Sequence, residues 1–352
     1  MLVTGYAMVE RGEPLEPFEY EARPAPGEVL VEVHGCGVCH TDLGFLDDGV
    51  PTRHALPLIL GHEISGVVVE AGAGAEDLVG QAVVVPAVIP CGACDACARG
   101  RGAICRAQVF PGNDVHGGFA SHTVVPARGL AAVGDLRGEP LARLAVVADA
   151  VSTAYQAVLR SGVGPGHLAV FVGAGGVGGF GIQVAAAFGA RVVAIDVDPD
   201  RLALVREHGA EWTLDARDRT PRQLRDAVRS LAKGNGLPSS EWRVFETSGT
   251  APGQETAFGL LTFGGYLGVV GFHPGEVPLR LSNLMAFEAK AEGHWGCLPE
   301  HFGRVLQMID SGALTLDPFI ELFALERVDE VLARLRRKEL GRRPVLVPPR
   351  SS

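Results

Sequence analysis

The feature that most constrains the fold is a glycine-rich turn between an apolar run and a helix-like segment. Residues 173–178 read Gly-Ala-Gly-Gly-Val-Gly and fit the pattern G-x-G-x-x-G, directly after the apolar run 167–172. The first glycine permits a tight turn, the second lets a pyrophosphate approach the backbone, and the third allows close helix–strand packing. The turn therefore predicts a parallel βαβ unit that binds a dinucleotide, with contacts from Gly173, Gly175, Gly176, Val177 and Gly178.

A carboxylate ends the next apolar run, 191–196. An acidic residue at that place can accept hydrogen bonds from both ribose hydroxyls of the adenosine, and its charge would repel a 2′-phosphate. Asp196 therefore favours NAD over NADP. Arg201 lies nearby and is a second candidate cofactor-binding residue, and its positive charge leaves NADP open. The alternative is a structural turn with a surface carboxylate.

Strands and helices alternate beyond this turn. We expect strands at 167–172, 191–196, 212–214, 243–247 and 266–271, and helices at 176–188, 199–208, 221–232 and 255–261. This rhythm predicts a doubly wound parallel sheet that extends towards six strands. It stops at about residue 290, after which we expect helices around 299–309 and 328–336 and a last strand near 344–347.

The first part of the chain has a different organisation. Short apolar runs before residue 150 are separated by glycine and proline, which predicts a β-rich domain. A chain of 352 residues also exceeds the size of one hydrophobic core. We therefore predict a β-rich domain over 1–155 and 291–352, with a dinucleotide-binding domain over 156–290 inserted into it.

Four cysteines lie within fifteen positions, at Cys91, Cys94, Cys97 and Cys105. The spacing C-x2-C-x2-C-x7-C lets four thiolates of one short loop converge on a single ion. It predicts a closed tetrahedral zinc site that stabilises the lobe 91–105 and leaves no position for substrate. An iron–sulfur cluster is the alternative, but the last gap is longer than in the usual run and Arg106 stands where proline is expected. Unmetallated reduced cysteines are a third alternative.

Composition excludes several classes of protein. Hydrophobic residues make up 47% and charged residues 20% of the chain, which is typical of a soluble globular enzyme. A net charge of −10 opposes binding to nucleic acid or to an anionic membrane, and no long apolar stretch predicts a membrane helix. The first residues lack the pattern of a secretion signal. We therefore expect a cytoplasmic protein, in which clustered cysteines favour metal over disulfides.

Two further clusters of metal-competent side chains lie in the β-rich domain, at residues 39–42 (Cys-His-Thr-Asp) and 61–63 (Gly-His-Glu). Taken alone, each is as consistent with buried polar residues as with metal ligands. Together with the four-cysteine lobe and the glycine-rich turn, they make the chain resemble the zinc-containing medium-chain dehydrogenase/reductase family, that of the zinc alcohol dehydrogenases. The resemblance extends from about residue 27 to about residue 347.

The resemblance implies an α/β fold in which a Rossmann domain is joined to a β-rich GroES-like catalytic domain. It implies NAD and two zinc ions per chain as cofactors, the structural zinc being held by the four-cysteine lobe. Cys39 and His62 match two ligands of the catalytic zinc. The third ligand is expected within 148–155, where many relatives have cysteine and this chain has Asp149, whose carboxylate oxygen is also a normal zinc ligand.

The resemblance also implies roles for the neighbours of these ligands. Glu63 matches an acidic residue that can approach the metal, and Asp42 is placed to accept from the second nitrogen of His62. Thr41 resembles the hydroxyl that accepts the alcohol proton before hydride transfer, and His40 resembles the residue that reaches the cofactor pyrophosphate. The histidine that ends the proton relay in many relatives is replaced here by Gly44, so the proton must leave by another route.

Segments 110–119 and 293–297 are expected to border the substrate cleft, although a turn and a packed loop account for them equally well. With 42–44 and 283–287, they are similar to the 6-hydroxycyclohex-1-ene-1-carbonyl-CoA dehydrogenases of anaerobic aromatic degradation. Four basic side chains could meet CoA phosphates, although isolated basic residues are more often solvated: Arg53, His54, Arg99 and Arg101. Cys36 and Cys297 are expected to be buried.

The expected function is hydride transfer from a secondary alcohol to NAD. The alternatives are a general secondary-alcohol or polyol dehydrogenase and, from another class, a non-catalytic NAD-binding structural protein. The expected partners are a small-molecule alcohol or hydroxyacyl-CoA substrate, with no nucleic acid and no membrane. By resemblance we also expect a homodimer or homotetramer that associates through the edge of the Rossmann sheet, around 266–271.

Overall fold

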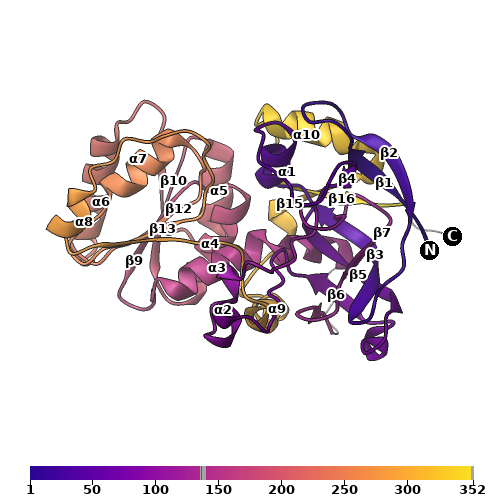
Figure 1. Ribbon diagram of the computed structural model, residues 1–352. Coiled ribbons are helices and arrows are strands. Elements are labelled where there is room, and N and C mark those ends of the chain that lie inside the picture. The colour runs from indigo at the N-terminus through magenta and orange to yellow at the C-terminus, as the bar shows by residue number, and fades with distance from the viewer. Residues whose placement is uncertain (135, 137–139, 350–352) are drawn as a thin grey trace. The chain divides into compact units, whose positions relative to one another are not determined.

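The computed structural model describes residues 1–134, 136 and 140–349, and it contains two compact units (Figure 1). The first unit consists of Met1–Ser152, Gly296–Ser311 and Leu316–Ser352, and the second of Thr153–Trp295 and Gly312–Thr315. The predicted domain boundaries lay after residues 155 and 290. The last three residues of the predicted first domain, 350–352, lie outside the described residues.

The first unit is built on two sheets. A three-stranded sheet has the order β2-β1-β4, with β1 at Leu2–Met8, β2 at Glu16–Glu21 and β4 at Leu58–Ile59. A seven-stranded sheet has the order β15-β16-β3-β5-β6-β8, and β7 pairs with β3. Its strands are β3 Glu28–Gly37, β5 Glu63–Ala71, β6 Ala82–Val85, β7 His122–Pro126, β8 Ala131–Ala132, β15 Ile320–Ala324 and β16 Arg343–Val347.

Helices of the first unit are few and short. The α-helices are α1 His40–Leu46, α2 Asp95–Ala98, α9 Phe302–Asp310 and α10 Val328–Arg336, and 3₁₀ turns lie at η1 Glu76–Leu78, η2 Gly102–Ile104, η3 Leu141–Ala148, η4 Pro299–His301, η5 Asp317–Phe319 and η6 Leu325–Arg327. The helix predicted at 299–309 is therefore a 3₁₀ turn followed by α9. The helix predicted at 328–336 is α10.

The last strand is part of the same sheet as the first long strand. β16 runs antiparallel to β3, with Val345 opposite Gly37 and Leu346 opposite Cys36. The alternating valines of β3 (Val29, Val31 and Val33) belong to one apolar core together with Val68 of β5 and Leu346 of β16. As a result, residues more than 300 positions apart in sequence lie in adjacent strands.

The second unit is a six-stranded parallel sheet with the order β11-β10-β9-β12-β13-β14, which confirms the predicted doubly wound sheet. The strands are β9 Leu168–Val172, β10 Arg191–Asp196, β11 Trp212–Asp215, β12 Arg243–Glu246, β13 Tyr266–Val269 and β14 Lys290–Gly293. The helices are α3 Ala150–Arg160, which starts at the end of the first unit, α4 Gly176–Ala187, α5 Pro199–Glu207, α6 Pro221–Gly234, α7 Ala251–Gly259 and α8 Ser282–Ala286.

The strand β9 lies in the middle of the six-stranded sheet. β9 is fully apolar and buried along its length, as expected of a strand covered on both faces, and Phe171 stacks on Phe245 of β12 at 4.5 Å between ring centroids. From β9 the chain adds β10 and β11 on one side and then crosses to add β12, β13 and β14 on the other side, so the strand order changes between β9 and β12. Ligands of such sheets bind beside the carboxyl ends of the strands at this point.

The second unit contains two helices that were not predicted, α3 and α8, and its elements α7 and β14 differ from the sequence prediction. The helix predicted at 255–261 begins four residues earlier, because the Oγ1 atom of Thr250 accepts from the backbone N–H of Gly253 and caps the first turn of α7. The sixth strand, β14, lies where the alternating rhythm was expected to stop. The sequence of β14 lacks an apolar pattern because it contains Lys290 and Glu292, and an edge strand can carry such charges whereas a central strand cannot.

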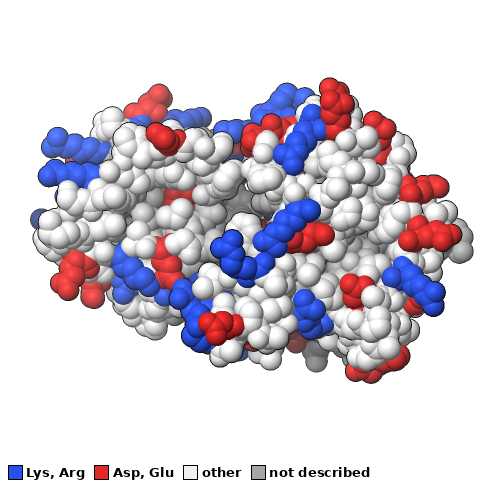
Figure 2. All heavy atoms as spheres, viewed as in Figure 1, with Lys and Arg blue, Asp and Glu red and all other residues white. Residues whose placement is uncertain are grey.

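The described part of the chain contains no helix that is long and apolar enough to cross a membrane. Basic and acidic side chains lie interspersed over the face shown in Figure 2, as is usual for a protein surface that carries both signs of charge.

Candidate active site

The four predicted cysteine ligands of the lobe converge. The Sγ atom of Cys94 lies 3.6 Å from that of Cys97 and 3.7 Å from that of Cys105, and the Sγ atoms of Cys91 and Cys97 are 4.0 Å apart. A tetrahedral zinc ion with Zn–S bonds of about 2.3 Å requires neighbouring sulfur atoms to be about 3.8 Å apart. The donor set and its spacing therefore fit one zinc ion.

Local backbone geometry prepares these thiols for a cation. The backbone N–H groups of Ala93 and Cys94 lower the pKa of the Cys91 thiol to about 6, and the N–H of Cys97 lowers the pKa of Cys94. Burial raises the pKa of Cys97 to about 11. Thiolates this close repel one another, so a divalent cation at their centre would stabilise the loop.

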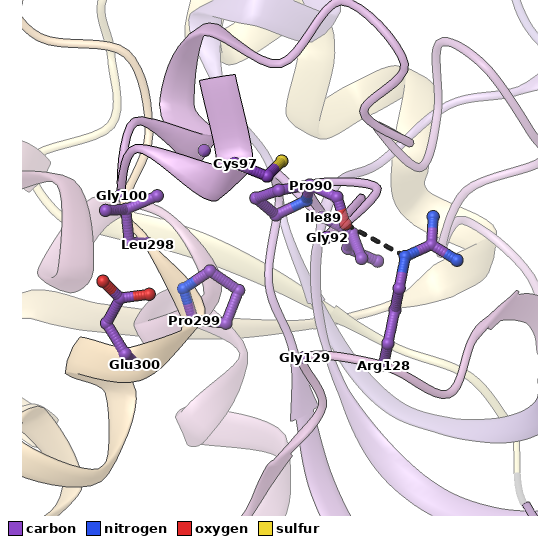
Figure 3. A pocket seen from close by; sticks show the side chains of 11 residues that line it. Ile89, Pro90, Gly92, Cys97, Gly100, Arg128, Gly129, Leu298, Pro299 and Glu300 are labelled. Carbon is purple, nitrogen blue, oxygen red and sulfur yellow. Dashed lines mark hydrogen bonds between the residues drawn. The ribbon is translucent and has the colours of Figure 1, made fainter. Parts of the chain in front are cut away.

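A cavity of about 250 Å³ lies beside this lobe (Figure 3). At its edge the Nε atom of Arg128 donates to the carbonyl oxygen of Pro90 at 2.9 Å. The other group of metal-competent residues, Cys39, His62, Glu63 and Asp149, does not line this cavity. The cavity is therefore a feature of how the lobe packs against its neighbours. The lobe contributes Gly92, Cys97, Gly100 and Gly102, and these face Leu298 and Pro299.

The second cluster brings the three predicted ligands of the catalytic metal together. One ligand atom each from Cys39, His62, Glu63 and Asp149 lies within 4.8 Å of all the others. Cys39 caps the N-terminus of α1, His62 and Glu63 stand at the start of β5, and Asp149 lies between η3 and α3. Cys39, His62 and Glu63 are buried.

The imidazole of His62 has the environment of a metal ligand. Its Nε2 atom lies 3.6 Å from the Asp149 carboxylate, and its Nδ1 atom lies 3.4 Å from the carboxylate of Asp42. Neither ring nitrogen has a hydrogen-bond partner among the described residues, although both are buried. A buried nitrogen without a partner costs free energy, and a cation bound to Nε2 would remove that cost.

The charge of the cluster also favours a cation. Burial raises the pKa of the Cys39 thiol, but the charge of Arg343 and the contact with His62 outweigh it, so the pKa is lowered. Burial lowers the pKa of His62, but Asp42 and Asp149 outweigh it, so the pKa is raised well above its usual range. The first shift means that neighbouring positive charge stabilises the Cys39 thiolate, and the second means that neighbouring carboxylates stabilise positive charge on His62.

Asp42 is held in place by two backbone groups. Its Oδ2 atom accepts from the N–H of Cys39 at 2.8 Å, and its Oδ1 atom accepts from the N–H of Gly61 at 3.2 Å. The first contact is the capping interaction of α1. The structure therefore brings the predicted orienting carboxylate against both segments that carry metal ligands.

Glu63 has a partner that the sequence analysis missed. Its carboxylate pairs with the Arg343 guanidinium through two hydrogen bonds, the one to Nε at 3.1 Å, and both side chains are buried. Burial raises the pKa of Glu63, and the charge of Arg343 opposes that effect. The only signal in the sequence was an arginine beside the predicted strand at 344–347.

Thr41 and His40 follow Cys39 directly. The Oγ1 atom of Thr41 lies 3.6 Å from the Cys39 sulfur and is half-buried, whereas His40 is exposed at the start of α1. Thr41 is therefore the predicted relay residue that the structure places beside a candidate metal ligand. Gly44 is buried within α1.

The glycine-rich turn has the geometry that its sequence predicts. Gly173 has a positive φ of 102°, and a Cβ atom there would lie 2.6 Å from the backbone nitrogen of Ser248. A Cβ atom at Gly178 would lie 2.0 Å from the carbonyl oxygen of Gly173, so only glycine fits. Gly175, Gly176 and Val177 are partly exposed at the N-terminus of α4, where a phosphate could contact backbone N–H groups.

Asp196 lies against this turn. One carboxylate oxygen accepts from the N–H of Ala174 at 2.6 Å, and the other accepts from the N–H groups of Val197 and Asp198 at 2.7 and 2.9 Å. Arg201 of α5 lies close to Gly175, but its Nε atom is 3.5 Å from the Asp198 carboxylate. The negative charge at this turn therefore exceeds the positive charge.

Two of the four residues suggested for CoA phosphates form ion pairs within the protein. Arg53 forms an ion pair with Asp114 at 3.0 Å, and Arg99 forms one with Asp95 at 2.7 Å. Segment 110–119 reaches the metal-competent cluster through Phe110, whose ring centroid lies 5.0 Å from that of His62. Segment 283–287 falls mostly in α8, and Cys36 and Cys297 are buried.

Comparisons with known proteins agree with this arrangement. Residues 25–135 match the family described as alcohol dehydrogenase GroES-like domain, and residues 176–311 match the zinc-binding dehydrogenase family. An alcohol dehydrogenase of Geobacillus stearothermophilus is 30% identical over 91% of each chain, and an L-threonine 3-dehydrogenase of Thermococcus kodakarensis is 32% identical over 91% of each. A cobalt- and zinc-bound alcohol dehydrogenase of Pyrobaculum aerophilum superimposes with a TM-score of 0.85 at 28% identity, covering 99% of this chain and 100% of that one. The predicted GroES-like and Rossmann domains are thus confirmed.

Removal of one lobe cysteine should release one metal ion without affecting the other. In Cys94→Ser a hydroxyl replaces one of four thiolates, so we expect the zinc content to fall by one per chain and amide exchange over 91–105 to accelerate. Metal analysis and hydrogen exchange measure these effects. Cys297→Ser, at a buried cysteine outside both clusters, is the control. Unchanged zinc in Cys94→Ser would exclude the lobe as a metal site.

Substitution of Arg343 alone should destabilise the first unit more than substitution of Arg343 and Glu63 together. Arg343→Met leaves a buried carboxylate unpaired, which costs about 3–5 kcal/mol of unfolding free energy. In the double variant Arg343→Met/Glu63→Gln most of that loss should disappear, as measured by urea unfolding. Arg327→Met, which breaks an exposed ion pair, should change little. Strictly additive effects of the two buried substitutions would contradict the pairing.

Proposed function

We propose that the chain, which is an oxidoreductase of the zinc-binding alcohol dehydrogenase family, transfers a hydride from a secondary alcohol to NAD. The observation that carries this proposal is the buried cluster of Cys39, His62 and Asp149, in which the His62 nitrogens have no hydrogen-bond partner among the described residues. We propose that these three residues hold a catalytic zinc ion and that the four-cysteine lobe holds a structural one.

When bound at this cluster, zinc would act as a Lewis acid that lowers the pKa of an alcohol hydroxyl. The protein side chains have separate tasks. Asp42 faces the ring of His62 and fixes the backbone of Cys39. The Arg343 guanidinium compensates the charge of Glu63, which keeps that carboxylate in place beside the ligands. Thr41, next to the Cys39 sulfur, is the hydroxyl closest in sequence to the cluster that can accept the alcohol proton.

The environment of Asp196 supports NAD as the cofactor. Its carboxylate is fixed beside the glycine-rich turn by three backbone N–H groups, and the neighbouring Asp198 partly compensates the charge of Arg201. A 2′-phosphate would meet two carboxylates there, whereas ribose hydroxyls would find an acceptor. Gly173–Gly178 would contact the pyrophosphate, and His40 is the proposed contact from α1.

Two substrate classes remain to be compared. A cyclic hydroxyacyl-CoA, such as 6-hydroxycyclohex-1-ene-1-carbonyl-CoA, is suggested by the resemblance of segment 110–119, to which Arg53 is attached through its ion pair with Asp114. A simple secondary alcohol or polyol is suggested by the Asp149 ligand. The internal ion pairs of Arg53 and Arg99 weaken the case for CoA, because a phosphate would have to replace their present carboxylate partners.

We also propose that the protein forms a homo-oligomer through the second unit. The strand predicted as the edge, β13, lies between β12 and β14, so the edge on this side of the sheet is β14 instead, with β11 at the opposite edge. Lys290, Ala291 and Gly293 are exposed on it, and the preceding helix α8 exposes 79% of Met285. A two-fold axis at such an edge would pair β14 with the same strand of a second copy.

A substrate screen tests the enzymatic proposal. The purified zinc protein should reduce NAD in preference to NADP, with activity towards at least one of cyclic hydroxyacyl-CoA, secondary alcohols, polyols or L-threonine, followed by NADH absorbance. Cys39→Ser should lose turnover by a factor of about 1,000 or more through loss of the catalytic zinc, and Val79→Lys, at an exposed valine outside both clusters, should not. Turnover of simple alcohols alone would reject the CoA substrate. NAD binding without turnover, in a protein with one zinc per chain, would favour the structural alternative.

A charge at the proposed interface should dissociate the oligomer. Met285→Lys places a cation on the exposed apolar surface of α8, so we expect sedimentation equilibrium to change from dimer or tetramer towards monomer. Val79→Lys, at an exposed valine of the first unit, should leave the mass unchanged. A wild-type protein that sediments as a monomer at micromolar concentration would refute the proposal.

A further inference from the structure

An aromatic ring lies against the imidazole of the proposed metal ligand His62. The ring centroid of Phe110 is 5.0 Å from that of His62, with an interplanar angle of 39°. The same ring meets Phe45 of α1 edge-on, with the centroids 6.4 Å apart. Phe110 is buried. One side chain therefore contacts both a candidate ligand and the helix whose first turn carries Cys39.

Among the residues that the structure describes, none forms a hydrogen bond that fixes the orientation of His62. Its Nδ1 atom is 3.4 Å from Asp42, beyond the usual range of about 2.7–3.2 Å for an N–H···O hydrogen bond. In metal sites the second nitrogen of a ligating histidine usually donates such a bond, which sets the plane of the ring. Because the distance from Nδ1 to Asp42 is too long for such a bond, the packing of Phe110 against the His62 ring must restrain the ring in its place.

Phe110 is itself held by a tight turn. The Oδ2 atom of Asp114 accepts from the backbone N–H of Phe110 at 2.8 Å, and the N–H of Asp114 donates to the carbonyl oxygen of Phe110 at 2.8 Å. At the tip of the turn Gly112 has a φ of 78°, and a Cβ atom there would be 2.9 Å from the nitrogen of Gly61. The turn therefore lies directly on the residue that precedes His62.

The outer side of this turn is attached to a second loop. The Oδ1 atom of Asp114 accepts from Nη1 of Arg53 at 3.0 Å, and the side chain of Asn113 accepts from the N–H of Arg53 at 3.0 Å. The carbonyl oxygen of Asn113 also accepts from the N–H of His54 at 2.8 Å. Asp114 thus uses one oxygen to hold Phe110 and the other to hold an exposed loop.

We propose that Phe110 is a positioning residue that sets the ring orientation of His62, and that Asp114, itself anchored by Arg53, holds Phe110 there. This inference rests on the proposed function, because it assumes that His62 ligates a metal ion. Asp114 and Arg53 act through Phe110 and have no direct part in the chemistry. The restraint is mechanical, so it affects how long the metal stays bound as well as how fast the enzyme works.

The rate at which a chelator removes the metal ions tests this role. Two phases are expected from the wild-type protein, one from each cluster, and Cys39→Ser identifies the phase of the catalytic cluster by removing it. In Phe110→Leu an apolar side chain remains but the flat ring is lost, so this phase should accelerate about tenfold or more, the effect typical of residues that orient metal ligands. Asp114→Ala should accelerate the same phase. The phase of the four-cysteine lobe is an internal control and should not change.

Phe302→Leu controls for a general loss of packing, because Phe302 is fully buried in α9 of the same unit and belongs to neither metal-competent cluster. A cobalt-substituted protein gives a second reading: the visible bands assigned to the catalytic cluster by comparison with Cys39→Ser should shift in Phe110→Leu and remain unchanged in Phe302→Leu. Wild-type release rates and bands in both Phe110→Leu and Asp114→Ala would overturn the positioning role alone. A wild-type protein that releases metal in a single phase, unaffected by Cys39→Ser, would overturn the proposed function and this inference with it.

Discussion

The candidate site depends on one buried carboxylate, that of Asp42. Its two oxygens accept from the backbone N–H groups of Cys39 and Gly61, and the same group faces the ring of His62. A carboxylate without solvent must satisfy its lone pairs inside the protein, so it holds the first turn of α1 against the segment that leads into β5. If this contact were lost, the pairing of Gly37 with Glu63 would still hold β3 against β5, but the direct link between the Cys39 and Gly61 backbones would be gone.

The second constraint is electrostatic. A thiolate and three carboxylates lie within or beside the cluster, and burying so much negative charge is unfavourable unless cations accompany it. Arg343 supplies one positive charge permanently, through its pair with Glu63. The remaining negative charge faces the unpaired nitrogen of His62, which is the arrangement expected of a site that is completed by a metal ion.

Local features of the site were readable from the sequence, and long-range ones were not. The lobe and the glycine-rich turn are encoded in short segments, where spacing alone determines which atoms meet, and Cys91–Cys105 and Gly173–Gly178 have the expected geometry. Arg343 and Phe110 contact the cluster only because strands and loops distant in sequence pack together. Neither has a pattern that distinguishes it from an ordinary strand or loop residue. The edge strand β14 escaped prediction for a related reason, since half-exposed charged residues resemble a loop.

The pairing of β16 with β3 bears on the order in which the protein can assemble. Arg343 follows Glu63 by 280 positions, and nearly the whole second unit is synthesised between them. During translation the second unit is therefore a contiguous segment that can fold as it emerges, whereas the first unit must wait with an unpaired acidic residue and an unfilled place in its sheet. Until that late strand arrives, the end of β3 at Cys36 and Gly37 lacks its β16 partner, because β7 pairs with β3 only at Glu28–Glu32, and its backbone groups stay open to pairing with another chain.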